Sequence, residues 1–476
     1  MQKPFYILIT GGVLSGLGKG VTTASIGKIL QAKGYSVTAI KVDPYLNFDA
    51  GTLRPTEHGE VWVTEDGGEI DQDLGHYERF LDISIPKYHN ITTGQIYYEV
   101  IKNEREGKYL GQTVQPIPHI TDEIKRRYRL VEKEGTDFIL IEIGGTVGDY
   151  ENVLFLEAAR QMKLEGIPML FIHVTYVPVP PHLGEAKTKP TQHSVKMLRE
   201  IGIQPDFIVA RSPKPLDDVR KRKIAIFCNV KEEDVISNPD VEIVYEIPLI
   251  FEAQNFGEKI LKKFGLKVRK NKLDKWRKSV EKIKSLKRIV KVAIAGKYFD
   301  IGDFVLTDSY VSVIEAVKHA AWNNNVKPEF VWINSKEIES EPKKLKELKN
   351  VDGLIVPGGF GTSGVEGKIM AIKFVRENDI PFLGLCFGLQ LAVVEFARNV
   401  CKLKNAHSME INPNTPNPVI DILPEQAKLL KKSKYGATMR LGIYPAILKK
   451  GTLVWKLYGR KRVVYERHRH RYEVNP

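Results

Sequence analysis

The sequence predicts an α/β protein with two doubly wound domains, each built on a sheet of parallel strands. Two series of short β-branched runs alternate with helical or loop segments along the chain, which is typical of such sheets. At 476 residues the chain is too long for one hydrophobic core. A Lys-rich, Gly-poor stretch at 266–290 separates the two series. We therefore expect one domain at 1–265, a helical interdomain linker at 266–290 and a second domain at 291–476.

The two series supply the expected strands. In the first domain these lie at 6–10, 36–42, 138–143, 169–175 and 207–210, and in the second at 291–296, 330–333, 353–356 and 382–385. In the linker, Trp276, Val280, Ile283 and Leu286 are spaced like one face of a helix. After residue 410 the pattern thins to two runs, at 438–441 and 453–457, so we expect the second domain to be incomplete at its C-terminal end.

Composition favours anionic partners. The 72 Lys and Arg residues exceed the 58 Asp and Glu residues, which gives a formal net charge of +14 and favours nucleotides, phosphates or nucleic acid. Much of the excess lies in runs at 267–291 and 460–471, and such runs are more often solvated faces, so nucleic acid is the minor alternative.

Cysteine usage and apolar runs bear on location. Three cysteines cannot form a disulfide framework in a chain of this length, which indicates a reducing compartment, and we expect the cytoplasm. The N-terminus shows no signal-peptide pattern. Apolar runs such as 167–174 are shorter than the ~20 residues that cross a bilayer, so we expect no membrane span.

A glycine-rich turn at 11–20 follows the first expected strand and leads into a helix. Its glycines allow backbone N–H groups to surround an anion, and the helix N-terminus adds partial positive charge. Lys19 brings a full positive charge to the outer phosphates. The pattern predicts a phosphate-binding loop, and a tight turn that merely needs glycine is the minor alternative.

This loop departs from the usual pattern because Gly20 stands where a Ser or Thr hydroxyl would bind magnesium. The metal must then take other oxygen ligands, and acids near strand ends are the candidates, namely Asp71, Asp73 and Glu142. Glu142 lies inside an apolar run, where a charge is costly to bury unless it has a partner. Magnesium would be such a partner, and a buried salt bridge is the alternative.

Cys386 lies between a strand and a helix in the pattern Gly-x-Cys-x-Gly. Such a turn exposes the side chain at the sheet edge, and the helix N-terminus lowers the thiol pKa and offers N–H groups to an oxyanion. A second glycine loop, at 356–361, could bring another N–H to the same oxyanion. We expect Cys386 to be a nucleophile, and Cys228 and Cys401 to be buried as small apolar residues.

These features belong to a set of specific stretches at 41–45, 65–67, 73–80, 142–149 and 187–194. With them the chain resembles the CTP synthase family over nearly its whole length. The resemblance implies an N-terminal phosphate-loop amidoligase domain and a C-terminal class I glutamine amidotransferase domain. It implies a ligase that phosphorylates the 4-oxygen of UTP with ATP and replaces the phosphate by ammonia taken from glutamine. The product is CTP, in the last step of pyrimidine nucleotide synthesis.

The resemblance also assigns roles to residues of this chain. Lys19 and Cys386 are the implied catalytic residues, Asp73 and Glu142 the implied magnesium ligands, and Lys41 is a plausible second cation. The implied ATP contacts are Gly16, Leu17, Gly18, Lys19, Gly20, Val21, Asp73, Asp240 and Val241. The implied UTP and CTP contacts are Ser15, Asp149, Tyr150, Glu151, Lys187, Thr188, Lys189, Pro190, Thr191, Gln192 and Lys223. The implied glutamine contacts are Gly359, Phe387, Gly388, Leu389, Gln390, Glu410 and Arg471.

The chemistry of these residues suits the implied ligands, since lysines bind a triphosphate, carboxylates accept from the exocyclic amine of cytosine and arginine pairs with a carboxylate. The resemblance further implies Mg²⁺ bound with ATP, GTP as an allosteric activator, CTP as a feedback inhibitor and a homotetramer.

One departure from the family concerns the base for Cys386. A cysteine nucleophile needs a histidine oriented by an acid, and the family takes both from a His-Pro-Glu segment well beyond Tyr472. None of His407, His468 and His470 is followed two residues later by Glu. Either a C-terminal piece is absent from this chain, which we favour, or glutamine hydrolysis is impaired while free ammonia is still used.

Two rival functions stay open at this stage. One is a ligase of the same plan that acts on a carboxylate or a cofactor precursor. The other is a phosphate-loop ATPase switch, or a basic nucleic-acid-binding protein, without ligase chemistry.

Overall fold

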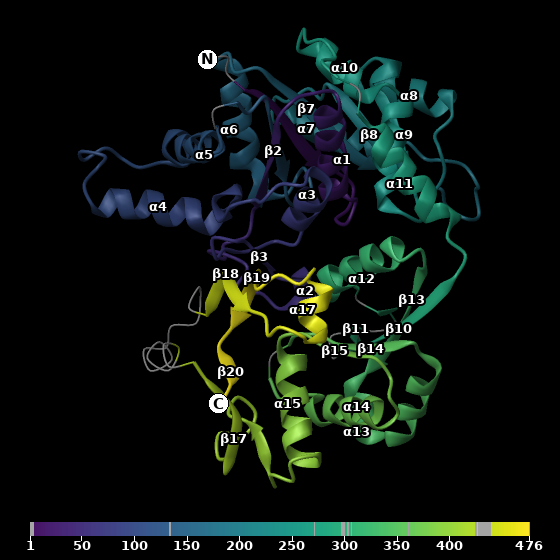
Figure 1. Cartoon of the computed structure of the whole chain (residues 1–476). Helices are drawn as coiled ribbons and strands as arrows, with labels where there is room; N and C mark the ends of the chain where they lie inside the picture. The colour runs from purple at the N-terminus through teal and green to yellow at the C-terminus, as the bar shows by residue number, and fades with distance from the viewer. Residues whose placement is uncertain are drawn as a thin grey trace. The chain divides into compact units, whose positions relative to one another are not determined.

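The computed structural model describes residues 4–132, 135–270, 272–296, 300–301, 304–305, 307–359, 361–423, 426 and 439–475. Contacts divide the chain into two compact units, Met1–Ala50 with Asp73–Val280 and Gly51–Gln72 with Glu281–Pro476 (Figure 1). Residues 51–72 therefore pack with the second half of the chain. The domain boundaries expected from the sequence stay a proposal.

The first unit is built on a seven-stranded sheet in the order β5-β2-β6-β1-β7-β8-β9. Every neighbouring pair in it is parallel. The strands are β1 (Phe5–Gly11), β2 (Val37–Asp43), β5 (Asn90–Thr92), β6 (Phe138–Ile143), β7 (Met169–Tyr176), β8 (Phe207–Ser212) and β9 (Val235–Pro239). All five runs expected here are strands. The three residues of β5 and the polar end of β9 had no apolar pattern that would predict them.

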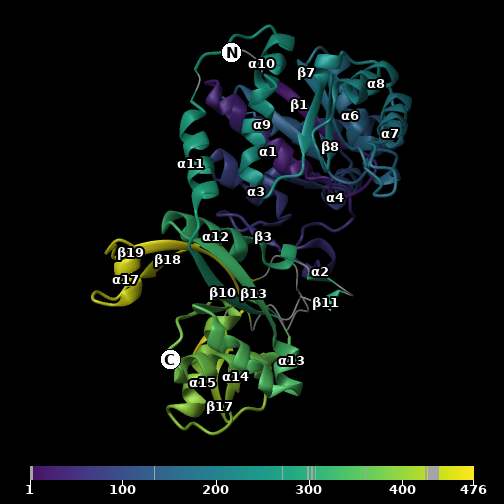
Figure 2. The same ribbon diagram turned by 90° about the vertical axis from the view of Figure 1, so that its right-hand side faces the viewer.

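Helices cover both faces of this sheet, so its strands are buried on both sides and read as continuous apolar runs. On one face, α4, α5 and α6 contribute to a single apolar cluster with β1, β2, β6 and β7. On the other face, α1 lies so close that a Cβ on Gly27 would stand 3.1 Å from Leu140 of β6. Figure 2 shows the helices of this unit around the sheet. They are α1 (Lys19–Ala32), α3 (Asp73–Leu81), α4 (Thr93–Arg105), α5 (Thr121–Arg129), α6 (Val153–Leu164), α7 (Lys189–Glu200), α8 (Asp218–Cys228), α9 (Ile247–Ala253), α10 (Phe256–Lys263) and α11 (Asp274–Ser285).

The expected linker contains α11, which packs on the first unit. The Trp276 indole N–H donates to the carbonyl of Tyr245 at 2.7 Å, and its ring lies 5.4 Å from that of Phe80. Val280 on the same helix is buried. The helical spacing in this stretch therefore reflects a face that packs against the protein.

The second unit holds a parallel sheet of four strands in the order β13-β10-β14-β15. These are β10 (Ile289–Gly296), β13 (Lys327–Asn334), β14 (Gly353–Val356) and β15 (Phe382–Gly384), and they correspond to the four runs expected. Helices α12 (Val311–Asn323), α13 (Ser335–Ser340), α14 (Val365–Glu377) and α15 (Phe387–Asn399) accompany them. Both units are thus of the α/β class that the sequence predicts.

Short elements complete the second unit. Strands β16 (Ala406–Ser408), β17 (Asn417–Ile422) and β20 (Tyr472–Val474) form a small sheet, and β18 (Arg440–Ile447) pairs with β19 (Val463–His470) as a hairpin. The run at 453–457 is a helix, α17 (Leu453–Leu457), and Thr438 of the run at 438–441 lies outside the described residues. Residues 51–72 supply α2 (Pro55–His58), β3 (Trp62–Val63) and β4 (Glu69–Ile70), and a further short pair is β11 (Asp300–Ile301) with β12 (Phe304–Val305).

No helix within the described part of the chain is both long enough and apolar enough to span a membrane.

Candidate active sites

The glycine-rich turn joins β1 to α1, as the sequence predicts. Gly16 and Gly18 adopt φ angles of 72° and 74°, a left-handed conformation that favours glycine. Gly18 is the N-cap of α1, so the free N–H groups of the first helical turn lie at the end of the loop. Such N–H groups bind phosphate.

Lys19 is the first residue of α1, and its side chain folds back along the loop. It is only 9% exposed, and its Nζ donates to the carbonyl of Gly145 at 2.9 Å. A Cβ on Gly11 would stand 2.7 Å from the Lys19 side chain, so a larger residue there would displace the end of the lysine. Burial lowers the pKa of Lys19, and the Glu142 carboxylate opposes that shift.

Three carboxylates converge on the ammonium of Lys41 at the end of β2. Lys41 Nζ pairs with the Asp73 carboxylate and lies 3.7 Å from Glu142 Oε1. Asp43, from the same strand, is 3.4 Å from this Nζ. Glu142 is 1% exposed and accepts a hydrogen bond from the hydroxyl of Tyr77. Of the three acids that the sequence selected, Asp73 and Glu142 therefore lie at one cation beside the phosphate loop.

The protonation of these two acids differs because their surroundings differ. Burial raises the pKa of Glu142 to about 7, although Lys41 opposes the shift. Burial acts in the same direction on Asp73, but there the charge of Lys41, helped by His76, holds the pKa below its ordinary value. A second cation would favour the ionised form of Glu142.

The geometry explains why Gly20 replaces the usual Ser or Thr of a phosphate loop. A Cβ at Gly20 would stand 2.6 Å from Oδ1 of Asp73. The Asp73 carboxylate thus occupies the space that a Ser or Thr side chain would fill. An oxygen atom is present at this position, but it comes from α3.

The segment assigned to UTP by resemblance leads into α7. Lys187 is ion-paired to Glu185 at 2.8 Å, and the hydroxyl of Thr188 accepts from Gln192 at 3.1 Å. Pro190 lies in the first helical turn, where its missing N–H costs nothing. Thr191 is buried against Thr175 of β7, at 3.1 Å between the hydroxyls.

The other residues assigned to nucleotides are spread over the same unit. The side chain of Asp149 accepts from the backbone N–H of Thr146 at 2.8 Å, close to the loop that holds Gly145. Tyr150 is 96% exposed, and Glu151 and Lys223 are exposed as well. Asp240 and Val241 directly follow β9.

Arg211 is a residue that the sequence did not single out. It lies in β8, and its guanidinium donates to the carbonyl of Leu17 at 3.4 Å and pairs with Asp240 at 3.1 Å. It therefore connects the phosphate loop to the segment after β9. An arginine directly after an apolar strand run was the available signal.

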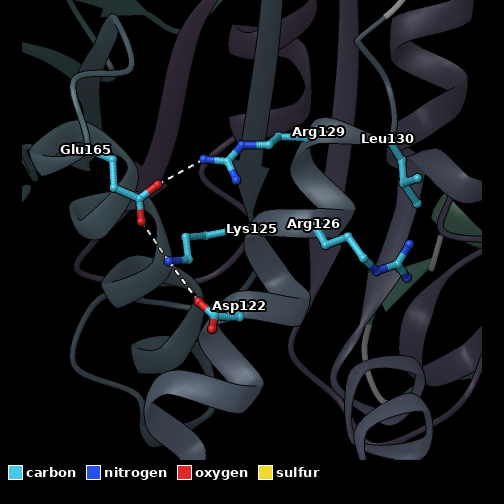
Figure 3. A pocket seen from close by; sticks show the side chains of 6 residues that line it. All are labelled: Asp122, Lys125, Arg126, Arg129, Leu130 and Glu165. Atoms are coloured by element: carbon cyan, nitrogen blue, oxygen red, sulfur yellow. Dashed lines mark hydrogen bonds and ion pairs between the residues drawn. The ribbon is translucent and has the colours of Figure 1, made fainter. Parts of the chain in front are cut away.

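A separate hollow of about 410 Å³ on the surface of this unit is lined by Asp122, Lys125, Arg126, Arg129, Leu130 and Glu165 (Figure 3). Glu165 accepts from both Lys125, at 2.7 Å, and Arg129, at 2.9 Å. Arg126 pairs with Glu123 at 2.6 Å. These cations are already matched by neighbouring acids, so the hollow is a weak candidate for an anion site.

Cys386 in the second unit forms a sharp turn between β15 and α15. It is the N-cap of α15 with φ of 53° and ψ of −113°, a conformation that L-residues rarely adopt. A Cβ at Gly388 would stand 1.9 Å from the carbonyl of Val356, and a Cβ at Gly384 would stand 2.8 Å from the backbone of Gly388. Both glycines of the Gly-x-Cys-x-Gly pattern are thus required by close backbone packing.

The thiol faces the second glycine loop. A Cβ at Gly358 would stand 3.5 Å from Cys386 Sγ, so this backbone approaches the sulfur directly. Burial raises the pKa of the Cys386 thiol, while the N–H of Phe387 and the charges of Arg469 and Lys368 act in the opposite direction. The neighbouring Phe360 lies outside the described residues.

Cys386, Gly358 and Gly359 line a cavity of about 590 Å³. Trp62 and Arg469 line it as well, which brings residues 51–72 to the nucleophile. The residues assigned to glutamine lie around the same elbow. Gln390 donates to the carbonyl of Tyr472 at 3.0 Å, next to Arg471, and Glu410 accepts from the N–H of Gly361 at 3.1 Å.

Three histidines follow Cys386 in the sequence. Among the described residues, His470 is the one of the three that lines the cavity, and burial lowers its pKa to about 4. His468 lies beside it, with 3.1 Å between the two Nδ1 atoms. His407 is buried elsewhere, where its Nδ1 accepts from the N–H of Ser408 and its Nε2 lies 3.5 Å from Glu366.

The expectation for the other two cysteines is half right. Cys228 is fully buried, and burial raises its pKa to about 12, as suits a small apolar residue. Cys401 is exposed, so the expectation of burial was wrong for this residue. It follows the end of α15, where the chain turns at the surface of the unit.

A phosphate loop with clustered acids on one α/β unit, and a cysteine elbow on a second, are the two parts of a glutamine-dependent amidoligase. The family model for the CTP synthase N-terminus matches residues 5–266, and that for the class I glutamine amidotransferases matches residues 305–476. The chain belongs to the CTP synthase family.

Known CTP synthases are similar in sequence to this chain over nearly its whole length. A CTP synthase from Pyrococcus abyssi is 58% identical over 99% of this chain and 86% of the relative, and one from Sulfolobus acidocaldarius is 56% identical over 99% and 88%. Among solved structures, the glutaminase domain of Trypanosoma brucei CTPS with bound acivicin is 36% identical. It covers 39% of this chain and 68% of that one, with a TM-score of 0.35.

Proposed function

We propose that this chain catalyses the ATP-dependent amination of UTP to CTP, with ammonia released from glutamine at Cys386. Family membership supports the reaction. The main structural support for assigning this reaction to particular residues is the cluster of Lys41, Asp73 and Glu142 beside the phosphate loop. The rival readings, a ligase for another acceptor and a nucleic-acid-binding switch, leave the match to CTP synthases along 99% of the chain unexplained.

In the synthetase reaction the 4-oxygen of UTP attacks the γ-phosphorus of ATP, and ADP leaves. Ammonia then attacks carbon 4, and phosphate leaves in place of a poor oxide leaving group. Lys19 neutralises charge on the outer phosphates of ATP, and the N–H groups at the start of α1 hold them in line. Lys41 supplies a second positive charge, and Lys187 to Gln192 with Lys223 bind the UTP triphosphate.

A magnesium ion fits this site. Two carboxylates of different elements already converge on one cation, and the Asp73 oxygen takes the place of the usual loop hydroxyl. Asp73 and Glu142 would hold the ion together with the ATP phosphates, where it supplies charge neutralisation for phosphoryl transfer. Ionisation of Glu142, which burial disfavours, is promoted by such a cation.

In the glutaminase reaction the Cys386 sulfur attacks the amide carbon of glutamine, and ammonia leaves a thioester that water converts to glutamate. The N–H groups of Gly359 and Phe387 stabilise the oxyanion. Gln390, Glu410 and Arg471 hold the substrate, with Arg471 on its carboxylate. Burial raises the pKa of the thiol, so the local positive charges are needed to form the thiolate.

Regulation and assembly are proposals of the same kind. GTP activates glutamine use, CTP inhibits at Asp149 and Glu151, the enzyme is a homotetramer, and it works in the cytoplasm. Their support is family membership.

The decisive experiment follows CTP formation from UTP, ATP and Mg²⁺ with either ammonium or glutamine plus GTP. We expect Lys19→Ala to abolish synthesis from both nitrogen sources and Cys386→Ala to abolish only the glutamine-dependent reaction. A folded protein that binds ATP but forms no CTP from ammonium would refute the synthetase assignment. Loss of the ammonium reaction in a folded Cys386→Ala variant would refute the division of labour.

A further inference from the structure

A buried chain of hydrogen bonds lies directly under the phosphate loop and is used by no step above. His173 of β7 is completely buried, and its two ring nitrogens both have partners. Nδ1 lies 2.8 Å from the hydroxyl of Thr10, at the end of β1, and Nε2 lies 2.8 Å from the hydroxyl of Ser194 on α7. Three elements of the first unit are therefore joined through one side chain.

The chain of bonds can be satisfied in one consistent direction. Burial lowers the pKa of His173 to about 3, so the ring is neutral and has one donor and one acceptor. The hydroxyl of Thr10 also reaches the carbonyl of Ile172, at 3.4 Å, which can only accept. With the proton on Nδ1, Ser194 donates to Nε2, Nδ1 donates to Thr10, and Thr10 donates to Ile172. Each donor then has an acceptor, which makes the arrangement rigid.

The two ends of this series of hydrogen bonds lie at the two segments that we propose bind nucleotides. Thr10 is followed by Gly11 and Gly12, which begin the phosphate loop. A Cβ on Gly12 would stand 1.6 Å from Ser194 Oγ and 2.7 Å from His173 Nε2, so the loop backbone rests directly on the pair. Ser194 lies on α7, two residues after the segment that ends at Gln192. Figure 1 labels β7 and α7 next to each other in this unit.

We propose that His173 is a positioning residue that locks helix α7 to the base of the phosphate loop, so that ATP in the loop and UTP at the start of α7 strengthen each other's binding. The inference rests on the proposed nucleotide sites and deepens them. When ATP orders the loop, the loop fixes the His173–Ser194 pair, and the pair fixes the helix that binds UTP. The reverse effect has the same size, because coupling between two sites is reciprocal.

Calorimetry with the 476-residue chain tests the inference, because it measures nucleotide binding without catalysis. UTP is titrated with and without a saturating β,γ-imido analogue of ATP and Mg²⁺. In the parent chain we expect the analogue to tighten UTP binding by about fivefold or more, the lower end of ordinary coupling. Ser194→Ala and His173→Asn both break the bond to α7, and each is expected to reduce this factor to less than about twofold while UTP still binds.

A matched control is His89→Asn, which removes another buried histidine of the same unit, in the turn directly before β5. Its Nδ1 lies 2.8 Å from the carbonyl of Ala39, away from the loop, and we expect full coupling in this variant. Should His173→Asn fail to fold, Ser194→Ala decides alone, since it removes one hydroxyl. Parent-like coupling in a folded Ser194→Ala variant, or no coupling in the parent, overturns the inference. A parent chain that binds no UTP at all overturns the proposed function instead.

Discussion

At the residue scale, the chain keeps its key charges buried and matches each one with specific neighbours. Lys41 holds Asp73 and Glu142 together, and burial moves the pKa of Glu142 upward while Lys41 keeps that of Asp73 low. Acids at strand ends could be selected from the sequence, because buried charge is costly and needs a partner. His173 could not, since a histidine in an apolar run shows neither of its hydrogen-bond partners.

The buried His173 predicts a pH dependence of stability. Its pKa is lowered to about 3 in the folded state, against an ordinary value of 6.5. The unfolded chain therefore binds the proton first, so this contribution is complete above pH 6.5 and is lost as the pH falls toward 3. Between these values the free energy of unfolding should fall by up to about 1.4 kcal/mol per pH unit from this group.

Urea unfolding at pH 5, 6 and 7.5 measures this slope. In His173→Asn, the unfolding free energy should fall less steeply with decreasing pH, by up to about 1.4 kcal/mol per pH unit. Ser194→Ala keeps the imidazole and should retain most of the pH dependence of the parent. Equal slopes in the parent and His173→Asn would show that folding leaves the pKa of the ring unchanged.

Lys368 makes a residue-scale prediction about the nucleophile. Its side chain is fully buried on α14, with Nζ 5.6 Å from the ring centroid of Phe387, the residue after Cys386. Its charge favours the Cys386 thiolate, which burial disfavours. We expect Lys368→Met to move the alkylation of Cys386 by iodoacetamide to higher pH and to slow it roughly threefold or more at pH 7.

The measurement needs a background without the exposed thiol, so both chains carry Cys401→Ser. Lys373→Met is the matched control, because this lysine lies on the same helix and is 45% exposed. An unchanged pH profile in folded Lys368→Met would exclude an effect of its charge on the sulfur.

At the element scale, the sequence predicted strands wherever apolar runs are buried on both faces. Strand β6 is an example, since all six of its residues are buried. Short strands with polar residues, such as β5 with Asn90 and Thr92, stabilise the sheet edge but carry no such pattern. Residues 51–72 were placed in the first domain by continuity, because contacts between distant parts of a chain leave no local signal. Arg211 did follow an apolar strand run, but its contacts with Leu17 and Asp240 are not visible in the sequence.

The elbow at Cys386 gives an element-scale prediction. In Gly388→Ala the new Cβ would lie 1.9 Å from the carbonyl of Val356, so α15 and β14 must move apart. We expect a loss of about 2–3 kcal/mol in unfolding free energy and loss of glutamine-dependent CTP formation, with ammonium-dependent synthesis retained. Gly353→Ala is the control, since its Cβ would meet nothing closer than 3.4 Å. Normal glutamine use by Gly388→Ala would mean that the elbow tolerates this displacement.

At the scale of the whole molecule, neither compact unit is formed by one continuous stretch of the sequence. Residues 51–72 leave the first unit, pack into the second and return at Asp73, a proposed metal ligand. The Arg469 guanidinium donates to Glu69 at 2.7 Å and to the carbonyl of Gly51 at 3.0 Å. Glu60 accepts from the N–H of Ser312 at 2.7 Å. The second unit is therefore completed by a segment from the first half of the chain.

This arrangement predicts that the second half alone is an incomplete protein. A fragment of residues 281–476 should unfold at lower temperature than this unit does in the whole chain, because Arg469 loses Glu69, which is nearly inaccessible to solvent. A synthetic peptide of residues 51–72 should bind the fragment with roughly micromolar affinity and raise its melting temperature. The same peptide with Glu60→Gln and Glu69→Gln should bind at least tenfold more weakly, since both charged hydrogen bonds are lost. Thermal unfolding followed by circular dichroism, with and without each peptide, measures both effects. If the fragment melts at the temperature of the intact unit and does not bind the peptide, residues 51–72 add nothing to the stability of this unit.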